Sequence, residues 1–339
     1  MRILHAVRSD GFAGVESHVA RLARAQRRSG HDVVVIGGEP RRMADDAGPG
    51  VRTLPAASVV DVYSAARSWG VGADVVHAHM TAAEIACAAA LFGRRVPLVA
   101  TCHFARERGS NPLFAVAAGA AARRIDAQIA ISRYVADKVA GPSVVVYPGV
   151  DATSAIGSAS DRDRVVLLAQ RLEPEKDSSL ALRAFAASGI APRGWSLEIA
   201  GDGAERPHLT RLAERLGIGD VTTFLGHRSD VPELMRRAGM LLAPCRVEGL
   251  GLTVLEAMAA GLPIVAVAAG GHLETVGRAE GAALHRAADA AGAGELLAGL
   301  AADPVARDAY GARLACVQQQ LFTPGLQAEQ TMAVYRSVL

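Results

Sequence analysis

The sequence predicts an α/β protein with two doubly wound domains. Short, continuously hydrophobic runs, such as 33–36 and 144–146, alternate with stretches of helical periodicity along the whole chain. Continuous hydrophobic runs are typical of parallel strands that are covered on both faces. A regular alternation of such strands with helices builds doubly wound sheets. A length of 339 residues exceeds what one hydrophobic core comfortably supports, so we expect two domains.

Each predicted strand is a short apolar run that precedes a turn or a helical stretch. In the first half of the chain these runs are Arg2–Val7, Asp32–Gly37, Val51–Leu54, Asp74–His77, Leu98–His103, Gln128–Ile131 and Val144–Tyr147. In the second half they are Val165–Ala169, Leu197–Ala200, Val221–Leu225, Met240–Ala243, Ile264–Ala268 and Ala282–His285. The carboxyl ends of parallel strands form the edge where ligands bind in open α/β sheets, so the residues that follow these runs are the first candidates for function.

The predicted helices carry apolar side chains on one face. The spacing is clear in Val15, Val19, Leu22 and Ala23, and again in Leu209, Leu212, Ala213 and Leu216. A small and polar segment, 151–164, marks the expected boundary between a domain of residues 1–152 and a domain of residues 153–323. A last helix, 324–339, follows a Thr-Pro break and has an apolar stripe, and we expect it to pack back on the first domain.

Composition excludes several classes of protein. The formal charge is only +2, without a long basic run, whereas a nucleic-acid-binding protein usually shows a clustered basic excess. The chain opens on a predicted strand rather than a signal peptide, and its longest apolar run, 113–122, is short for a membrane span. The four cysteines, Cys87, Cys102, Cys245 and Cys316, form no C-x-x-C pair, so we expect reduced, buried thiols in a cytoplasmic protein.

The strongest functional signal is Glu248–Glu256, in which two carboxylates bracket seven residues. This segment follows the predicted strand Met240–Ala243 and opens a helix near Thr253. Its two glycines permit close approach of the backbone to a ligand, and free amides at the start of a helix suit an anionic phosphate. Glu256 is within reach of a ribose diol beside that phosphate, and Glu248 of hydroxyls at the far end of the ligand. An ordinary loop with a solvated glutamate is the alternative explanation.

Two cations follow another strand of the second domain. Arg171 and Lys176 come after Val165–Ala169, and Pro174 breaks the chain between them, so they are loop cations rather than a helical pair. Two cations at one strand end fit a diphosphate leaving group. A surface charge cluster is the alternative, because two glutamates lie between them. Glycine turns follow two further strands, at Gly201-Asp202-Gly203 and at Gly270-Gly271 before Glu274.

These motifs together resemble the retaining GT-B glycosyltransferases of family 4. In the second half, the segments in the order and spacing of that family are Arg171–Lys176, Gly201–Gly203, Glu248–Glu256 and Gly270–Glu274. In the first half they are Ala13–Glu16, Asp74–His79, Thr101–His103, Ala130–Ser132 and Tyr147–Asp151. The resemblance spans nearly the whole chain. It implies two Rossmann-like domains that face a central cleft, and transfer of a hexose-type sugar from a nucleotide-diphosphate sugar to a hydroxyl acceptor with retention of configuration.

The resemblance also implies a role for each matching residue in the second domain. Glu248 is similar to the glutamate that holds donor-sugar hydroxyls, and Glu256 to the ribose ligand. Arg171 and Lys176 are similar to the diphosphate clamp. Backbone amides are expected to bind sugar and phosphate at Gly249, Leu250, Gly251, Leu252 and Thr253.

In the first domain, the resemblance places Gly14, at the start of the first helix, across the cleft from the same diphosphate. His103 is similar to the active-site histidine near the anomeric carbon, so His103 and Glu248 are the catalytic candidates. The leaving phosphate assists the incoming hydroxyl on the same face in such enzymes, so no side-chain nucleophile, cofactor or metal is implied. Cations and amides that stabilise charge on the leaving phosphate agree with this mechanism.

The histidines have simpler interpretations as well. His103 could satisfy a buried carbonyl at a strand end. His77 and His79 are expected to be structural or to line the cleft, and His18 and His31 are expected to be ordinary. The polar loop after His103, with Arg106 and Arg108, is expected to select the acceptor, which is a small molecule, a glycan or a lipid head group with at most peripheral membrane contact.

Other functions on a similar fold remain open. A disaccharide synthase and a retaining phosphorylase share the fold. An NAD-dependent oxidoreductase needs a G-x-G-x-x-G fingerprint after the first strand, and Gly11 and Gly14 do not meet that spacing. A sugar-nucleotide binding module without catalysis would not need the pair of cations at residues 171 and 176.

Overall fold

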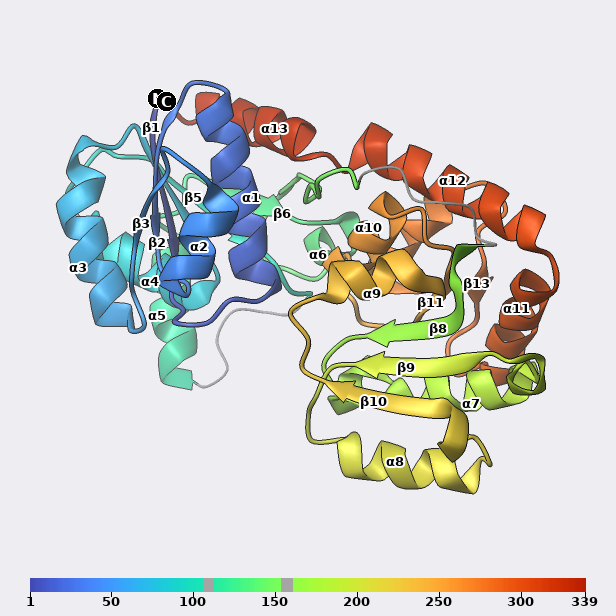
Figure 1. The fold of residues 1–339 in the computed structure, drawn as a ribbon. Helices are drawn as coiled ribbons and strands as arrows, with labels where there is room; N and C mark the ends of the chain where they lie inside the picture. The colour runs from blue at the N-terminus through green and yellow to red at the C-terminus, as the bar shows by residue number, and fades with distance from the viewer. Residues whose placement is uncertain (106–111, 154–160) are drawn as a thin grey trace. The chain divides into compact units, whose positions relative to one another are not determined.

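The computed structural model describes residues 1–105, 112–153 and 161–339 (Figure 1). Its contacts divide the chain into two compact units. Unit 1 comprises Met1–Gly149 and Phe322–Leu339, and unit 2 comprises Val150–Leu321. Unit 1 is therefore built from two separate segments of the chain, whereas unit 2 is built from one.

Unit 1 contains a parallel seven-stranded sheet in the order β3-β2-β1-β4-β5-β6-β7. The chain runs outward from β1 to β3, returns to the other side of β1 with β4, and continues to the far edge. The point where the order reverses lies between β1 and β4. The strands are β1 (Arg2–Val7), β2 (Asp32–Ile36), β3 (Arg52–Leu54), β4 (Val75–His79), β5 (Leu98–Cys102), β6 (Ala127–Ala130) and β7 (Val144–Val145).

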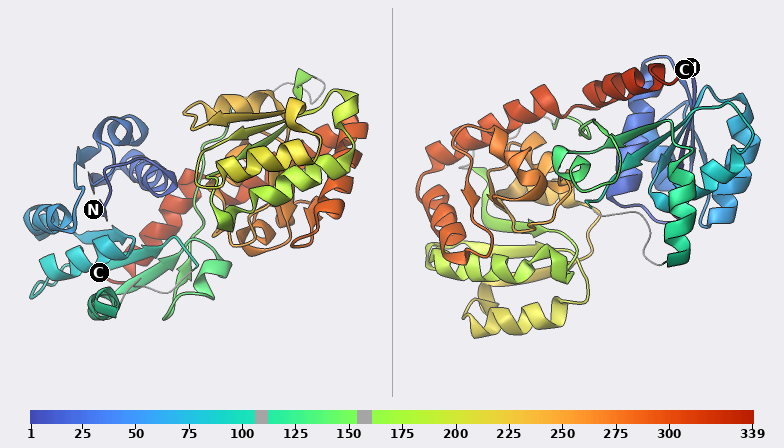
Figure 2. Two further views of the ribbon diagram at one scale, coloured as in Figure 1. Left: turned by 90° about the horizontal axis from the view of Figure 1, so that it is seen from below. Right: turned by 180° about the vertical axis from the view of Figure 1, so that it is seen from behind.

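Helices cover both faces of this sheet, as the views in Figure 2 show. One face packs its alternate apolar side chains, Ile3 and Val75 among them, against α1, α2 and α13. The other face, with Leu4 and Val76, packs against α3 and α4. This two-sided burial explains why the strands are hydrophobic at consecutive positions. The helices are α1 (Gly14–Arg28), α2 (Pro40–Ala47), α3 (Val59–Trp69), α4 (Thr81–Ala90), α5 (Pro112–Ala122), α6 (Arg133–Ala136) and α13 (Pro324–Arg336).

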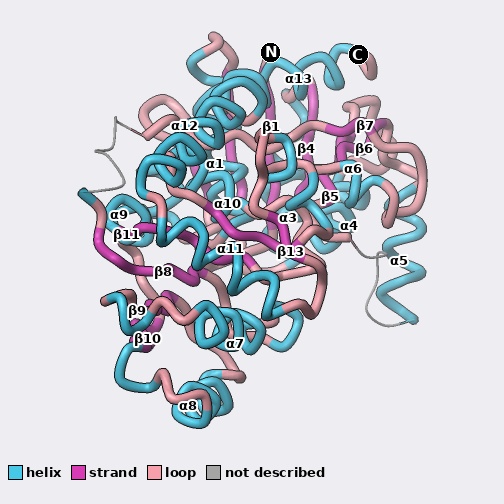
Figure 3. The backbone as a smooth tube through the Cα atoms, turned by 90° about the vertical axis from the view of Figure 1, so that its right-hand side faces the viewer, coloured by secondary structure: helices cyan, strands magenta, loops and turns pink. Residues whose placement is uncertain are grey.

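Unit 2 repeats this architecture with a six-stranded sheet in the order β10-β9-β8-β11-β12-β13, all parallel. Figure 3 shows strands of this sheet in magenta, with β8, β9, β10, β11 and β13 labelled. The strand order reverses between β8 and β11. The strands are β8 (Asp163–Ala169), β9 (Ser196–Ala200), β10 (Thr222–Gly226), β11 (Ala238–Ala243), β12 (Ile264–Val267) and β13 (Leu284–His285). The helices are α7 (Ser178–Ser188), α8 (Arg206–Arg215), α9 (Val231–Arg237), α10 (Leu252–Ala259), α11 (Ala290–Ala302) and α12 (Pro304–Leu321).

The predicted α/β class is confirmed, and each predicted run overlaps a strand. Three strands are two residues longer at one end than predicted: β8 begins at Asp163, β11 begins at Ala238, and β4 extends to His79. His79 pairs in register with Val7 on one side and Thr101 on the other. One cysteine prediction is wrong: Cys316 on α12 is exposed, while the other three are buried. Within the described residues, no helix is both long enough and apolar enough to cross a membrane.

Candidate functional site

In unit 2, the candidate site lies where the strand order of the sheet reverses. The loop after β8 carries Lys176, and the loop after β11 carries Glu248. These two strands are neighbours in the sheet, although 72 positions separate the two residues. Ligands bind at such reversal points in open α/β sheets, because the loops on either side diverge and leave space between them.

Lys176 and Glu248 form an ion pair, with 2.6 Å between Nζ and Oε2. Their side chains are 18% and 26% exposed. Burial opposes the charge of both groups, but each partner supports the charge of the other. As a result, the pKa of Lys176 is raised above its ordinary value, and the pKa of Glu248 is lowered below its own. Both groups are charged at neutral pH, and each keeps free donor or acceptor positions for a further partner.

Arg171 lies in a different environment from Lys176. Its side chain is 67% exposed and pairs with Glu175, with 3.3 Å between Nη2 and Oε1. A pair this exposed contributes little to stability, about 0–1 kcal/mol. The structure therefore brings Glu248 together with Lys176, whereas Arg171 is held on the surface by a weak contact that an anion could replace.

The loop that carries Lys176 is held by a residue that the sequence analysis did not single out. The amide of Gln170 donates to the carbonyl oxygen of Lys176 and to the hydroxyl of Ser178, both at 2.9 Å. The loop after β9 crosses close to Gln170: a Cβ on Gly201, whose φ is +151°, would lie 1.8 Å from the Gln170 carbonyl oxygen. Glycine is needed there for close backbone approach.

The segment Glu248–Glu256 forms a loop followed by α10. The helix begins at Leu252, with Gly251 as its N-cap at φ +90° and without a side-chain cap. The first backbone bond of the helix runs from the amide of Leu255 to the carbonyl of Gly251. The amides of residues 252–254 thus precede that bond, and the partial positive charge of a helix start suits an anion. Glu256 lies in the second turn and is half-buried.

Gly270 and Gly271 support this loop from the 3₁₀ turn that follows the neighbouring strand β12. The amide of Gly271 donates to the carbonyl of Glu248 at 2.9 Å. A Cβ on Gly271 would lie 2.3 Å from the Cα of Leu250. The second glycine pair therefore has a packing role against the carboxylate loop.

His272 was not a candidate from the sequence. It is buried, at 1% exposure, and its Nδ1 has no hydrogen-bond partner within the described part of the chain. Burial lowers its pKa to about 4, against the opposing charge of Glu248. The neutral imidazole is thus part of the surroundings of Glu248. The only signal in the sequence was its place beside the glycine pair.

In unit 1, the predicted residues lie at and beside the corresponding reversal point, between β1 and β4. Gly14 begins α1 directly after the loop that follows β1. His103 follows β5 and is 8% exposed. The two acceptor-side candidates, Arg106 and Arg108, lie outside the described residues.

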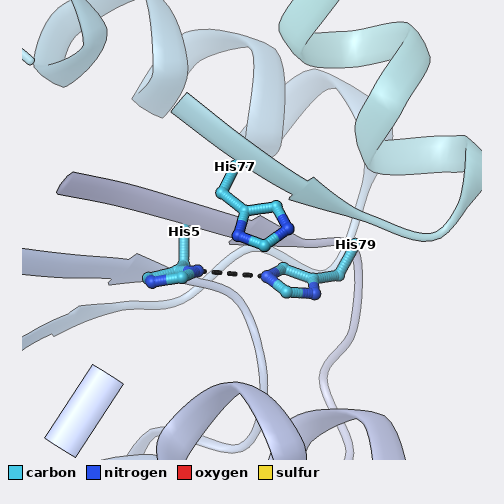
Figure 4. A group of neighbouring side chains, drawn as sticks. All are labelled: His5, His77 and His79. Atoms are coloured by element: carbon cyan, nitrogen blue, oxygen red, sulfur yellow. Dashed lines mark hydrogen bonds between the residues drawn. The ribbon is translucent and has the colours of Figure 1, made fainter. Parts of the chain in front are cut away.

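His103 belongs to a group of five buried histidines. His5 and His77 face each other in register on β1 and β4, and His79 lies two positions further along β4. Figure 4 shows these three, with a hydrogen bond between His5 and His79. His18 comes from α1, and its ring meets the ring of His103 edge-on with 4.7 Å between centroids.

Burial lowers the pKa of every histidine in this group. The pKa falls to about 4 for His5 and to about 3 for His103, and it lies well below 6.5 for His18, His77 and His79. The five imidazoles are therefore neutral at pH 7. The sequence pointed to three of them: His103 as a catalytic candidate, and His77 and His79 as structural or cleft-lining residues. His5 and His18 gave no such signal, because their place in the group depends on the packing of the sheet and α1.

Ring nitrogens of two sets, His5-His77-His79 and His18-His79-His103, lie within 4.8 Å of one another, which is close enough to consider a metal. The rings of His77 and His79, however, are tilted by only 33° with centroids 4.2 Å apart. Both nitrogens of each of these two rings take part in hydrogen bonds to other side chains. A metal bound by either ring would have to replace these bonds.

Comparison with known proteins agrees with this architecture. Residues 151–313 match the family described as Glycosyl transferases group 1, and residues 12–154 match Glycosyltransferase Family 4. Glycogen synthase of Mycobacterium tuberculosis is 30% identical over 324 residues, which cover 78% of this chain and 77% of that protein. The chain belongs to the family 4 glycosyltransferases. It is therefore a glycosyltransferase, as its motifs predicted.

Other relatives of this glycosyltransferase match over different lengths. D-inositol 3-phosphate glycosyltransferase of Salinispora arenicola is 34% identical over 173 residues, and the match covers 43% of this chain but only 38% of that protein. The crystal structure of HepE from Anabaena, in complex with UDP and glucose, superposes with a TM-score of 0.81 at 23% identity, covering 99% of this chain and 100% of that chain. The structural likeness supports the GT-B class, with two Rossmann-like domains.

Proposed function

We propose that this glycosyltransferase moves a hexose-type sugar from a nucleotide-diphosphate sugar to a hydroxyl acceptor, with retention of configuration and without a metal. The observation that carries the proposal is the Lys176–Glu248 pair beside the uncapped start of α10. It combines a half-buried cation, a carboxylate and free amides at the reversal point of one sheet. A sugar diphosphate needs these groups: cations and amides for its phosphates, and an acceptor for its hydroxyls.

Each group has a separate role in this proposal. Lys176 has three N–H donors and uses one on Glu248, so two remain for phosphate oxygens. Arg171 adds a second charge when it exchanges Glu175 for the ligand. The amides of residues 249–253 bind the phosphate and the sugar, and Glu256 on α10 binds the ribose.

Glu248 accepts the bond from Lys176 on Oε2, and its remaining acceptor positions are proposed to meet sugar hydroxyls. The cation keeps Glu248 ionised, so it acts as an acceptor rather than a donor. Charge on the leaving diphosphate grows as the sugar–phosphate bond breaks, and Lys176 and the amides stabilise that charge. The leaving phosphate then takes part in activating the incoming hydroxyl on the same face of the sugar.

In unit 1, Gly14 and His103 are the proposed contacts to the same ligand. The acceptor is proposed to be a small molecule, a glycan or a lipid head group, with at most peripheral contact to a membrane. A cytoplasmic location and the absence of nucleic-acid partners belong to the same proposal. HepE of Anabaena was crystallised with UDP and glucose, so uridine nucleotides are the first donors to test.

The test is a donor screen. The purified chain is incubated with UDP-, GDP- and ADP-sugars, and release of the nucleoside diphosphate is measured with and without EDTA. We expect turnover with one nucleotide class and no effect of EDTA on the rate. The NMR coupling constant of the anomeric proton in the product should show the same anomeric configuration as in the donor. Inverted product, or activity that EDTA abolishes and magnesium restores, would contradict the proposal.

The chain offers a matched control for the cation. It contains two lysines, Lys176 and Lys138, and Lys138 is exposed in unit 1. Lys176→Met should lower kcat by about 100-fold or more, in line with the loss of one preorganised charge from an electrostatic site. Lys138→Met should leave the rate unchanged. Formation of a sugar phosphate from a glycan and inorganic phosphate, without use of any nucleotide sugar, would indicate a phosphorylase instead.

A further inference from the structure

The buried histidines of unit 1 are linked in a chain of hydrogen bonds that ends at His103. Nε2 of His5 lies 2.7 Å from Oε1 of Gln26. Nδ1 of His5 lies 3.1 Å from Nε2 of His79, and Nδ1 of His79 lies 3.1 Å from Nε2 of His103. Figure 4 shows the middle link of this chain. The first three side chains have no exposed surface.

Such a chain has a direction. A neutral imidazole has one N–H donor and one bare nitrogen that accepts. If one ring nitrogen donates its hydrogen bond, the other must therefore accept one, so the first bond of a ring determines the direction of the second. The amide oxygen of Gln26 can only accept, which places the proton of His5 on Nε2 and leaves Nδ1 bare. His79 must then donate from Nε2, and His103 must donate from Nε2 as well. The order leaves Nδ1 of His103 without a proton.

The orientation of the Gln26 amide agrees with a second branch of the network. Its Nε2 donates to the hydroxyl of Tyr335 at 3.4 Å. That hydroxyl donates to Nδ1 of His77 at 2.6 Å, and Nε2 of His77 donates to the hydroxyl of Thr101 at 2.7 Å. One amide therefore sets the direction of both branches.

We propose that His5 and His79 are positioning residues that hold His103 in the Nε2–H tautomer, so that its bare Nδ1 accepts a hydrogen bond from a sugar or acceptor hydroxyl. The hydroxyl partner rests on the proposed function, whereas the tautomer rests on the hydrogen-bond chain alone. Within residues 1–105, 112–153 and 161–339, no protein group donates to Nδ1 of His103. His103 also follows β5 at the carboxyl edge of the sheet, where ligands of such folds bind.

The neutral state of the rings supports the same conclusion. Burial lowers the pKa of His103 to about 3 and that of His5 to about 4. A second proton on any ring would also break the order of the chain, because a cationic imidazole has two donors and no acceptor. His103 therefore acts as a neutral hydrogen-bond acceptor that orients a hydroxyl, rather than as a group that stores a proton.

The tautomer can be measured directly. Protein labelled with ¹⁵N-histidine gives separate ring-nitrogen signals for protonated and bare positions, and loss of one set of signals in His103→Asn identifies His103. We expect a protonated Nε2 and a bare Nδ1 at pH 7. A proton on Nδ1, or a cationic ring at neutral pH, overturns the proposal whether or not the protein transfers sugar. One bound zinc ion per chain, by elemental analysis, overturns it too, because the metal would occupy the bare nitrogens.

Substitutions at His79 and His77 on β4 distinguish a role of His79 in positioning His103 from a role in folding alone. His79→Leu removes the acceptor of His103 and should leave its ring as a mixture of tautomers, with kcat/KM lowered about 10–100-fold, as for outer partners of metal-bound histidines. His79→Asn keeps an acceptor oxygen near the position of Nδ1 and should restore one tautomer and most of the activity. His77→Leu is the control: it is equally buried on the same strand but outside the chain to His103. It should lower stability and leave the His103 tautomer unchanged.

Three outcomes of this series can be told apart. If the His103 ring becomes a mixture of tautomers in both His79→Leu and His77→Leu, the network acts only through packing, which contradicts the proposal. A single tautomer in wild type that His79→Leu leaves unchanged would show that His103 is ordered by another group, also against it. If the tautomer responds as expected but no nucleotide sugar is consumed by wild type, the positioning role stands and the proposed function fails.

Discussion

The five buried histidines of unit 1 should make this unit sensitive to mild acid. Their pKa values are lowered by burial in the folded state, to about 4 for His5 and about 3 for His103, from an ordinary value of 6.5. The unfolded chain therefore binds more protons than the folded one below pH 6.5. Stability rises with pH wherever the unfolded state binds more protons, so it is fully present above pH 6.5 and is lost as the pH falls toward 4.

The size of the effect follows from the number of groups. At pH 5.5, one pH unit below the ordinary pKa, each histidine that stays neutral in the folded state costs about 1.4 kcal/mol. Five such groups cost about 7 kcal/mol relative to pH 7.5. A domain is typically stable by only about 5–15 kcal/mol, so unit 1 should be close to unfolding at pH 5.5.

The two tryptophans of the chain allow each unit to be followed alone. Trp69 ends α3 in unit 1, and Trp195 is buried in unit 2. In urea titrations at pH 7.5 and 5.5, Trp195→Phe reports on unit 1 and Trp69→Phe on unit 2. Unit 2 contains two histidines with lowered pKa, His272 and His285, so it should lose less than half as much stability.

A further substitution tests whether the buried histidines cause the loss of stability at pH 5.5. In the Trp195→Phe background, His77→Gln removes one of the five titrating groups, so the difference between pH 7.5 and 5.5 should shrink by about 1.4 kcal/mol even if the overall stability is lower. A change below about 1 kcal/mol in unit 1, or an equal change in both units, would refute the reasoning, because the buried rings would then not be the groups that titrate.

Three further predictions concern single contacts. In a double-mutant cycle, Lys176→Met and Glu248→Gln should show a coupling of about 1–3 kcal/mol in urea unfolding, between the values for exposed and fully buried pairs. Gly271→Ala should destabilise unit 2 by about 3 kcal/mol in the same assay, because its Cβ would meet the Cα of Leu250 at 2.3 Å. Tyr335→Phe should cost unit 1 about 1–3 kcal/mol, because it leaves buried hydrogen-bonding groups without their partner.

Each of these predictions has a control in the chain. The exposed pair Arg171–Glu175 should couple by less than about 1 kcal/mol. Gly299, on α11, has open space where a Cβ would be added, and Gly299→Ala should stabilise by up to about 1 kcal/mol. For Tyr335, Leu339→Ala removes an exposed side chain from the same terminus and should change little. Equal effects in a prediction and its control would contradict the corresponding contact.

Local patterns were sufficient to predict the strands and the carboxylate loop. Continuous apolar runs marked β2 and β12, and the glycines between Glu248 and Glu256 marked a loop that opens a helix. These features depend on neighbours within a few residues. The assignment of roles to Glu248 and Glu256 rested on resemblance and stays a prediction.

Contacts between distant parts of the chain could not be predicted in the same way. Lys176 meets Glu248 only because β8 and β11 are adjacent in the sheet, and nothing local distinguishes Lys176 from the exposed Arg171. Gln26, on α1, reaches His5 through the packing of that helix on the sheet. The directions of such hydrogen bonds are properties of the folded structure, and a periodic pattern carries no information on them.

The division of unit 1 into two segments has a consequence for synthesis on the ribosome. Unit 2 is continuous, so all of its strands and helices have been synthesised by residue 321. Unit 1 lacks α13 until residues 322–339 follow, and α13 supplies Tyr335 to His77 and Gln327 to His18. Before then, the nascent sheet of unit 1 holds polar rings without two of their partners. Most of unit 1 is thus translated first, but its core is completed last. The nascent polypeptide must remain soluble without α13 on its first sheet while unit 2 is synthesised and folds.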